Sequence, residues 1–312
     1  MSDNNKFSRR GFVSLTGLGG VSALVNPSFA AAEASKKSDI GATFILWGYD
    51  ARVLEPAVRD LSQLGFHAFE TFGEVLEKYE NEKGGLQPMI DKYNIPLISG
   101  FCNGDVVNPE KFQQQKDNFH RWCKLVKKYG GKVIEFSTIG ADRRKGFDYR
   151  EHKKFMIESM NEYAKLISDY GLVCALHPHT GTPVETQEEV YFVMENVDTR
   201  YMRFGPDVGQ LEKGGADPVK IVKDFLPLVE HVHLKDYAGG DNGYLGYTPL
   251  GEGKVDLKTI LKMLEARRGK MAGMIMFELD YDGKILAPYA EYRAAEISHD
   301  YLKKLGYRFV KR

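Results

Sequence analysis

The sequence predicts a single (β/α)8 TIM barrel that follows an N-terminal export signal. From residue 42 onward, short apolar runs rich in β-branched residues alternate with longer segments of helical periodicity. Eight such runs occur before the C-terminus. No G-x-G-x-x-G motif follows the first run, so an open dinucleotide-binding sheet is the less favoured alternative. Eight consecutive βα units with right-handed crossovers close most simply into a barrel.

The first residues have the order of a secretory signal. A basic segment precedes a weakly apolar stretch over residues 12–25, and small residues follow at 30–32. The run SRRGFV at residues 8–13 resembles the twin-arginine motif S-R-R-x-F-[LV] of proteins that are exported in the folded state. We therefore expect an export signal over residues 1–32, a barrel over residues 40–312, and a mature protein in the periplasm.

Eight segments are predicted as the strands of the barrel. Each is short, apolar and enriched in β-branched or aromatic residues, as expected for parallel strands that are buried on both faces. They are residues 42–47, 67–72, 95–101, 132–137, 172–177, 201–206, 230–235 and 273–279.

The segments between these strands have the periodicity of helices that cover a sheet with one face. Met156 and Met160 share such a face of one predicted helix. Gly65 and Gly171 stand where a helix C-terminus favours a left-handed residue, shortly before the next strand. Asp256 precedes an apolar stripe as the N-cap of another helix.

The net charge, the cysteines and the length of the apolar runs limit which kinds of partner the protein is expected to bind. The 43 basic and 43 acidic residues cancel to a formal charge of zero, which gives no reason to expect nucleic acid or an anionic membrane. The three cysteines lack C-x-x-C spacing and are predicted to be buried thiols. No run after the signal approaches the ~20 apolar residues that span a bilayer. We expect a soluble protein with a small-molecule partner, and the sequence leaves a homo-oligomer open.

Polar residues end four successive predicted strands, at the barrel face where active sites are built. Two imidazoles and two carboxylates meet there, and such a mixed ligand set suits Mn, Co, Zn or Fe better than Ca or Mg. A single histidine at a strand end is more often hydrogen-bonded than metal-bound, so the prediction depends on the joint placement of all four. The predicted ligands of a divalent cation are His177, Asp207, His233 and Glu278.

The chain also resembles the xylose-isomerase-like barrels, a family that includes sugar epimerases, hydroxypyruvate isomerase, inosose dehydratase and endonuclease IV. Asp207, His233 in the run HVHLKD and Glu278 in the run MFELD match cation ligands of the sugar epimerases. The run PLGEGKVD at residues 249–256 is similar to one that follows strand seven in many members. The resemblance covers essentially the whole chain after the signal.

Two departures from the epimerase pattern are evident. The epimerases have a glutamate on strand five, whereas this chain has His177 in a run HPHTGT similar to that of inosose dehydratases. Gln210 stands where epimerases often have histidine. Sugar epimerases use two glutamates on opposite faces of the substrate, and an imidazole in place of one breaks that symmetry. A nuclease similar to endonuclease IV is disfavoured because the chain lacks net positive charge.

The resemblance implies a reaction that begins with the removal of a proton next to a carbonyl. A cation would polarise the carbonyl of a keto-sugar or cyclitol and stabilise the resulting enediolate. The base is predicted to be His179, Lys235 or Glu278. Reprotonation would give an isomerase or epimerase, which is the leading prediction, and loss of a neighbouring substituent would give a lyase or dehydratase. A sugar-binding barrel is the non-enzymatic alternative.

Polar and aromatic side chains at other strand ends are predicted to line a sugar pocket. Tyr49 and Glu74 are candidates for its rim. The glycine-rich stretch 238–254 is a candidate lid, with an ordinary surface loop as the alternative. The predicted substrate-binding residues are Trp47, Glu70, Asn103, Glu135, Gln210 and Asp280.

Overall fold

The structure is a computed structural model that describes residues 37–311, apart from 241, 282 and 284–286. The export signal predicted for residues 1–32 lies outside the described residues, so it stays a prediction.

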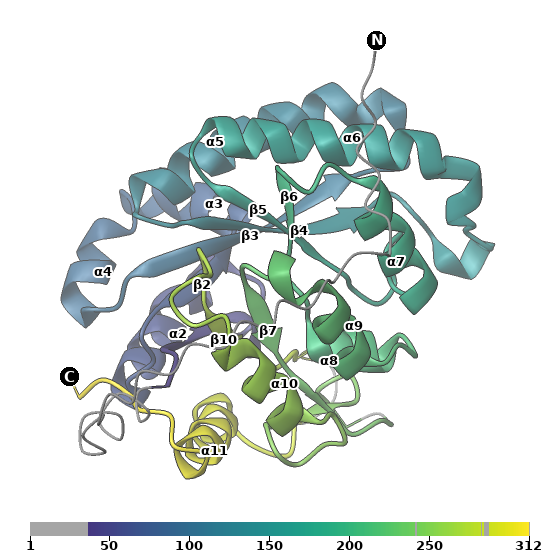
Figure 1. Ribbon diagram of the computed structural model, residues 1–312. Coiled ribbons are helices and arrows are strands. Elements are labelled where there is room, and N and C mark those ends of the chain that lie inside the picture. The colour runs from purple at the N-terminus through teal and green to yellow at the C-terminus, as the bar shows by residue number, and fades with distance from the viewer. Residues whose placement is uncertain (1–36, 241, 282, 284–286, 312) are drawn as a thin grey trace, which may run out of the picture. The chain divides into compact units, whose positions relative to one another are not determined.

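Eight parallel strands form one sheet, in the order β6-β5-β4-β3-β2-β1-β10-β7 (Figure 1). Two parallel bridges, Phe204 with Val229 and Asp207 with His233, join the β6 and β7 segments. The sheet therefore closes on itself, and the predicted (β/α)8 barrel is confirmed. The strands are β1 Ile40–Thr43, β2 Phe69–Phe72, β3 Leu97–Asp105, β4 Val133–Ile139, β5 Val173–His177, β6 Met202–Phe204, β7 Val232–Leu234 and β10 Ile275–Phe277.

Each predicted strand has an observed counterpart, with shifted ends. The first strand begins two residues earlier than predicted and ends at Thr43, because Ile45–Trp47 form a 3-10 turn, η1, instead of continuing the strand. β3 extends to Asp105, whose carboxylate accepts hydrogen bonds from the backbone of the turn that follows. Strand ends are thus set by local hydrogen bonds as well as by the apolar pattern.

Helices pack around the strands, and α5 and α6 lie side by side along β3, β4 and β5 (Figure 1). Gly65 ends α2 in the left-handed conformation (φ 82°), and Asp256 caps α10 by accepting a hydrogen bond from Thr259 N, as predicted. The α-helices are α2 Ala51–Leu64, α3 Gly73–Lys83, α4 Gln87–Tyr93, α5 Phe112–Lys128, α6 Tyr149–Asp169, α7 Gln187–Asn196, α8 Val208–Lys213, α9 Pro218–Phe225, α10 Leu257–Glu265 and α11 Glu291–Lys304. Further 3-10 turns are η2 Pro109–Lys111, η3 Arg143–Lys145 and η4 Leu226–Leu228.

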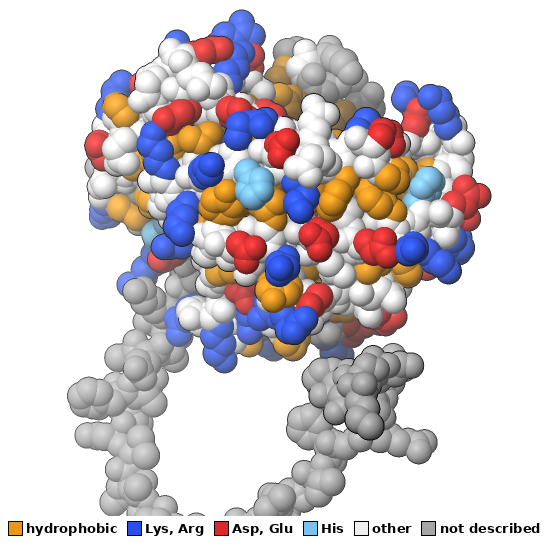
Figure 2. All heavy atoms as spheres, turned by 90° about the horizontal axis from the view of Figure 1, so that it is seen from above, with side chains coloured by type: hydrophobic (Ala, Val, Ile, Leu, Met, Phe, Trp, Pro, Cys, Tyr) orange, Lys and Arg blue, Asp and Glu red, His pale blue; other side chains and the backbone are white. Residues whose placement is uncertain are grey.

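The distribution of charged side chains and of cysteines agrees with what the composition predicts. Acidic and basic side chains are interspersed on the face that Figure 2 shows. None of the helices among the described residues is long and apolar enough to cross a membrane. Cys102, Cys123 and Cys174 are buried free thiols, as predicted.

An aromatic cluster joins β4 to the helices outside it. The ring of Phe136 on β4 lies 5.7 Å from that of Phe119 on α5 and 5.9 Å from that of Tyr163 on α6, between centroids. All three side chains are fully buried. This cluster fixes the strand that carries Glu135 and Ser137 toward the barrel interior.

Replacing Phe136 with alanine should therefore lower the free energy of unfolding by about 3–5 kcal/mol, because the lost ring leaves a cavity that its neighbours fill only in part. Urea denaturation of Phe136→Ala and of the control Tyr292→Ala measures this. Tyr292 is 37% exposed, and its replacement should cost no more than about 0.5 kcal/mol. Equal costs for the two variants would contradict the packing described.

Candidate active site

A cavity of about 410 Å³ lies at the C-terminal ends of the strands. Its polar lining combines acids, amide, hydroxyls and an imidazole, and its apolar lining is largely aromatic. The polar side chains are Glu74, Asn103, Ser137, His179, Thr180, Thr182, Glu278 and Asp280. The apolar ones are Ile45, Tyr49, Phe72, Phe101 and Leu245.

The predicted pocket residues occupy three different places. Asn103 and Asp280 line the cavity, as do Tyr49 and Glu74. Trp47 lies in the turn after β1, where its indole Nε1 donates to Asp60 Oδ2 over 3.0 Å, away from the cavity wall. The remaining three, Glu70, Glu135 and Gln210, are buried and contact histidines of the site.

The four predicted cation ligands converge beneath the cavity. His177 ends β5, His233 lies in β7, and Glu278 directly follows β10. Asp207 follows β6 and pairs with His233 across the barrel seam. His233 Nδ1 lies 3.0 Å from Glu278 Oε2, and His177 Nε2 lies 3.9 Å from Asp207 Oδ2. All four side chains are buried.

The atoms that face one another in this group form no well-directed hydrogen bonds, although Asp207 Oδ2 and His233 Nδ1 each lie close to a charged side chain. His177 Nε2, Asp207 Oδ2 and His233 Nδ1 are buried without a well-directed hydrogen bond among the described residues. Ligand atoms of Asp207, His233 and Glu278 all lie within 4.8 Å of one another. A cation bound between Asp207, His233 and Glu278 would contact their buried ligand atoms, and His177 Nε2 lies 3.9 Å from Asp207 Oδ2 at the edge of this group. The donor set therefore fits a divalent cation with nitrogen and oxygen ligands.

The helix that follows β6 fixes the orientation of Asp207. Its Oδ1 accepts hydrogen bonds from Gly209 N and Gln210 N, both at 2.9 Å, and so caps α8. The other oxygen, Oδ2, faces the candidate cation site and the Lys235 ammonium, which lies 2.9 Å away. One carboxylate thus serves both the helix end and the site.

Lys235 is a fully buried cation at the edge of this group. Its ammonium lies close to three carboxylate oxygens, which are Asp207 Oδ2 at 2.9 Å, Glu278 Oε1 at 2.6 Å and Asp280 Oδ1 at 3.0 Å. Burial alone would lower the pKa of the Lys235 ammonium, but the charges of these carboxylates raise it well above its usual range. The Lys235 side chain is therefore held as a charged ammonium.

The two imidazoles of the ligand set differ in their electrostatic surroundings. Burial lowers the pKa of His177 well below its usual range, which keeps the ring neutral, as a cation ligand must be. Burial also acts to lower the pKa of His233, but the charges of Glu278 and Glu70 on either side raise this pKa well above its usual value. Conversely, although burial raises the pKa of Glu278, the charges of His233 and Lys235 hold it well below its usual value.

His179 lines the cavity in a defined tautomer. Its Nδ1 lies 2.8 Å from the Thr180 carbonyl oxygen and donates to it, and its Nε2 lies 2.8 Å from Gln210 Nε2 and accepts. The Gln210 amide is oriented by Oε1, which accepts from Thr180 N and Oγ1. This network assigns the lone pair of His179 to Nε2.

The stretch predicted as a lid is fastened at its C-terminal side. It begins with a short hairpin, β8 Asp236–Tyr237 with β9 Tyr247–Thr248. The Asp236 carboxylate accepts hydrogen bonds from the backbone N–H groups of Gly251, Gly253 and Val255. A Cβ at Gly253 would collide with that carboxylate, which accounts for glycine there. The PLGEGKVD run thus holds a loop from which Leu245 reaches the cavity.

Seven lining residues were not singled out from the sequence. Ser137, Thr180 and Thr182 are polar residues at strand ends, so the same rule that found Asn103 could have found them. The apolar members carry no comparable signal, because they read as ordinary core residues. These are Ile45, Phe72, Phe101 and Leu245.

Comparison with known proteins assigns the chain to a family. The sequence profile of the xylose isomerase-like TIM barrel matches residues 58–305. The chain belongs to this family. The chain is similar to the inosose dehydratase of Clostridium beijerinckii. The two are 25% identical over 261 residues, which cover 75% of this chain and 85% of that enzyme.

Solved structures agree with the family assignment at the level of the fold. The 3-keto-D-glucoside 4-epimerase from E. coli has a TM-score of 0.64 and 18% identity, over 86% of this chain and 99% of that one. A xylose isomerase-like TIM barrel protein from Mycobacterium smegmatis, solved in complex with magnesium, has a TM-score of 0.66 and 16% identity, over 86% and 96% of the two chains.

Proposed function

We propose that this member of the family is a divalent-cation-dependent dehydratase of a keto-sugar or cyclitol. One observation carries the proposal. The end of β5 supplies two imidazoles, His177 among the cation ligands and His179 in the cavity wall, where a two-glutamate epimerase has a carboxylate. The relatives named inosose dehydratase support the same branch.

The chain is a carbohydrate-acting enzyme of the isomerase, epimerase or lyase kind. All three reactions begin with the same proton removal next to a carbonyl. They differ in what leaves and in where a proton returns, so the acid and base groups of the cavity decide among them.

His179 is the best placed of the three predicted bases. Its side chain lines the cavity, and its Nε2 lone pair accepts only a hydrogen bond from the Gln210 amide, which a substrate would displace. Lys235 is held as a charged ammonium by three carboxylates, so it cannot accept the proton. Both oxygens of Glu278 contact cations of the protein, His233 and Lys235, which makes its carboxylate a weak base.

The proposed step removes a proton and a hydroxide from neighbouring carbons. His179 Nε2 takes the proton α to the carbonyl, and the electron pair of that C–H bond forms a C=C bond. The C–O bond at the β-carbon breaks, and the proton that turns the leaving hydroxyl group into water comes from Lys235 by way of Asp280, whose carboxylate contacts the ammonium and lines the cavity. A divalent cation held by His177, Asp207, His233 and Glu278 would supply charge stabilisation at the substrate oxygen.

The cavity lining favours a substrate without a phosphate group. Among the described residues that line it there is no lysine or arginine, the side chains that usually bind phosphate. Hydroxyl and carboxylate groups such as Thr182 and Glu74 suit the hydroxyl groups of a free or glycosidic sugar. A periplasmic location, which the N-terminal sequence predicts, would agree with such a substrate.

Exchanging His179 for glutamine should lower kcat by about 10²–10⁴-fold, as expected for loss of a general base. The binding of Mn²⁺ should not change, since His179 is not among the cation ligands. Steady-state kinetics together with calorimetric titration of Mn²⁺ separate the two effects. A variant that keeps its kcat would show that another group is the base.

The product distinguishes the dehydratase from the epimerase branch. Wild-type protein with Mn²⁺ is incubated in D2O with inosose, a 3-keto-glucoside and common ketoses, and products are followed by NMR and mass spectrometry. Loss of water with formation of an enone supports the dehydratase. Deuterium incorporation with all substituents retained supports an isomerase or epimerase, and release of the aglycone from the 3-keto-glucoside supports a glycoside-cleaving lyase. A chain that binds sugars without any of these reactions would be a binding protein.

A further inference from the structure

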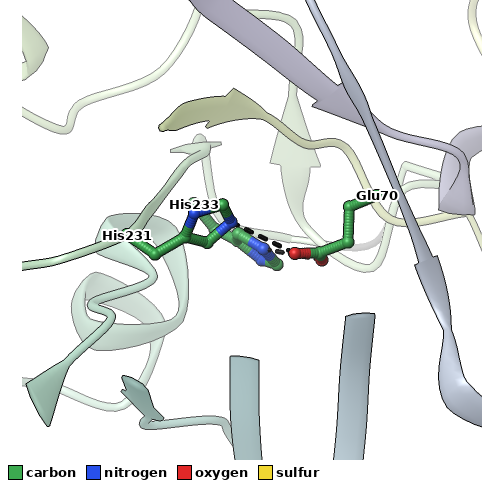
Figure 3. Close-up of side chains that lie close together, drawn as sticks. All are labelled: Glu70, His231 and His233. Carbon is green, nitrogen blue, oxygen red and sulfur yellow. Dashed lines mark hydrogen bonds and ion pairs between the residues drawn. The ribbon is translucent and has the colours of Figure 1, made fainter. Parts of the chain in front are cut away.

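Two buried carboxylates lie below the cavity, next to the candidate cation site. Glu70 comes from β2 and Glu135 from β4, and neither lines the cavity. Figure 3 shows the Glu70 carboxylate turned toward the rings of His231 and His233. Glu70 Oε1 lies 2.9 Å from His233 Nε2, and Oε2 lies 3.1 Å from His231 Nε2. Glu70 is 2% exposed, so water does not compete for these contacts.

The hydrogen bonds around Glu70 determine which atoms carry protons. His231 Nδ1 accepts a hydrogen bond from Met274 N at 3.0 Å, so its proton is on Nε2 and points to Glu70. Ser99 Oγ donates to the same oxygen, Oε2, at 2.5 Å. Two donors thus occupy Oε2, and Oε1 is the oxygen that lies against His233 Nε2, as an ion pair without a well-directed hydrogen bond.

This arrangement decides how His233 can bind a cation. A neutral imidazole has one N–H and one lone pair. When a cation binds at Nδ1, on the side of Glu278, the one remaining proton of His233 lies on Nε2, against Glu70. Histidine ligands of metals commonly donate their second N–H to a carboxylate, which fixes the ring and makes it a stronger ligand.

Glu135 stands in the same relation to His177. Its Oε1 lies 3.1 Å from His177 Nδ1, and both side chains are completely buried. The other ring nitrogen, Nε2, faces Asp207 without a hydrogen bond. A Cβ at Gly205 would collide with the Glu135 carboxylate, so glycine on the neighbouring segment makes room for it. Where the epimerases have a glutamate at the end of strand five, this chain has His177, and the carboxylate of Glu135 contacts the far side of its ring.

We infer that Glu70 and Glu135 are positioning residues, which hold the N–H of His233 and of His177 so that the opposite ring nitrogens bind one shared divalent cation. The inference rests on the proposed cation dependence. A second cation held by Glu70, His231 and His233 Nε2 is the competing arrangement. Glu70 Oε2 already accepts from Ser99, which favours hydrogen bonding over a second cation.

Calorimetric titration of the full chain with Mn²⁺ tests the inference. Glu70→Gln and Glu135→Gln should each bind Mn²⁺ about 10–100-fold more weakly than the wild type, as measured for partners of metal-bound histidines. Glu189→Gln is the matched control. Glu189 is also buried and paired with an arginine, but it belongs to the capping box of α7, a role that glutamine can fill. Its affinity for Mn²⁺ should not change.

A second readout separates positioning from a general loss of stability. In proton NMR of the Co²⁺-loaded full chain, each histidine ligand gives a shifted signal from its remaining ring N–H. We expect two signals protected from solvent exchange, one from His233 Nε2–H and one from His177 Nδ1–H. Glu70→Gln should shift the first signal and speed its exchange, and Glu135→Gln should do so for the second.

Each outcome decides between the arrangements. Unchanged affinity and unchanged N–H signals in a variant would overturn the role of that residue and leave the proposed function intact. Two Mn²⁺ ions per wild-type chain, with one lost in Glu70→Gln, would show a second cation site instead. A wild-type chain that binds no Mn²⁺ would overturn both the inference and the proposed cation dependence. If a variant does not fold, protected N–H signals in the wild type still support the inference, and their absence contradicts it.

Discussion

Replacing Lys235 with methionine is expected to reduce kcat by about 10²–10⁴-fold and, without added cation, to lower the free energy of unfolding by about 3–5 kcal/mol. The catalytic loss follows from removal of the proposed acid. The loss of stability follows because Asp207, Glu278 and Asp280 would remain buried together without the ammonium that lies within 3.0 Å of each. Urea denaturation and steady-state kinetics measure the two effects.

Saturating Mn²⁺ should restore part of the stability of Lys235→Met, since a bound cation replaces the missing positive charge near two of these carboxylates, and it should not restore kcat. Lys254→Met serves as the control. Lys254 is an exposed residue in an ion pair with Glu212, and its loss should cost at most about 1 kcal/mol. If Lys235→Met were as stable as Lys254→Met and as active as the wild type, the ion-pair network described here would have no functional role.

Replacing Asp207 with asparagine should weaken Mn²⁺ binding by more than about 100-fold, which exceeds the effect expected for residues behind the ligands. Activity at low Mn²⁺ should fall in parallel. Asparagine caps a helix as well as aspartate does, so α8 should keep its hydrogen bonds to Gly209 and Gln210. Calorimetric titration and activity at increasing Mn²⁺ measure the role of Asp207 as a cation ligand. Thermal unfolding measures its role as the N-cap of α8.

Asp217→Asn is the matched control for this change. Asp217 caps α9 by accepting a hydrogen bond from Lys220 N at 3.0 Å, and it is exposed, whereas the candidate cation ligands are buried. Its replacement should alter neither Mn²⁺ binding nor activity. An Asp207→Asn variant with wild-type affinity for Mn²⁺ would remove this residue from the proposed ligand set.

The sequence was sufficient for the barrel and for the convergence of four strand-end residues. Apolar runs and helical stripes identify the βα units, and a polar residue where a strand ends is visible without coordinates. His177 and Glu278 were found in this way, and the structure brings them together with His233. The convergence follows from topology alone, because the C-terminal ends of all barrel strands meet at one face.

The sequence did not predict how deep in the barrel each strand side chain lies. Glu70 and Glu135 were predicted to bind substrate because they are acids on strands that end at the cavity. The strand register pairs Ser137 with His177 and Glu135 with Ala175, so Ser137 reaches the cavity and Glu135 lies one layer lower. An apolar pattern gives the identity of a strand but not its register with its neighbours.

Trp47 shows a different limit. The apolar run 42–47 was predicted as a strand that would end by presenting this indole to the substrate. A 3-10 turn at Ile45–Trp47 redirects the chain, and the indole instead hydrogen-bonds to Asp60 on α2. Tyr49, two residues further on, occupies the cavity rim. Periodicity alone does not separate a strand end from a short turn of equal apolarity.

Anomalous X-ray diffraction from crystals of the protein grown with Mn²⁺ is the most direct test of the candidate site. One peak per chain is expected, within bonding distance of His177 Nε2, Asp207 Oδ2, His233 Nδ1 and a carboxylate oxygen of Glu278. A peak between Glu70, His231 and His233 Nε2, or no peak in the barrel at all, would contradict it.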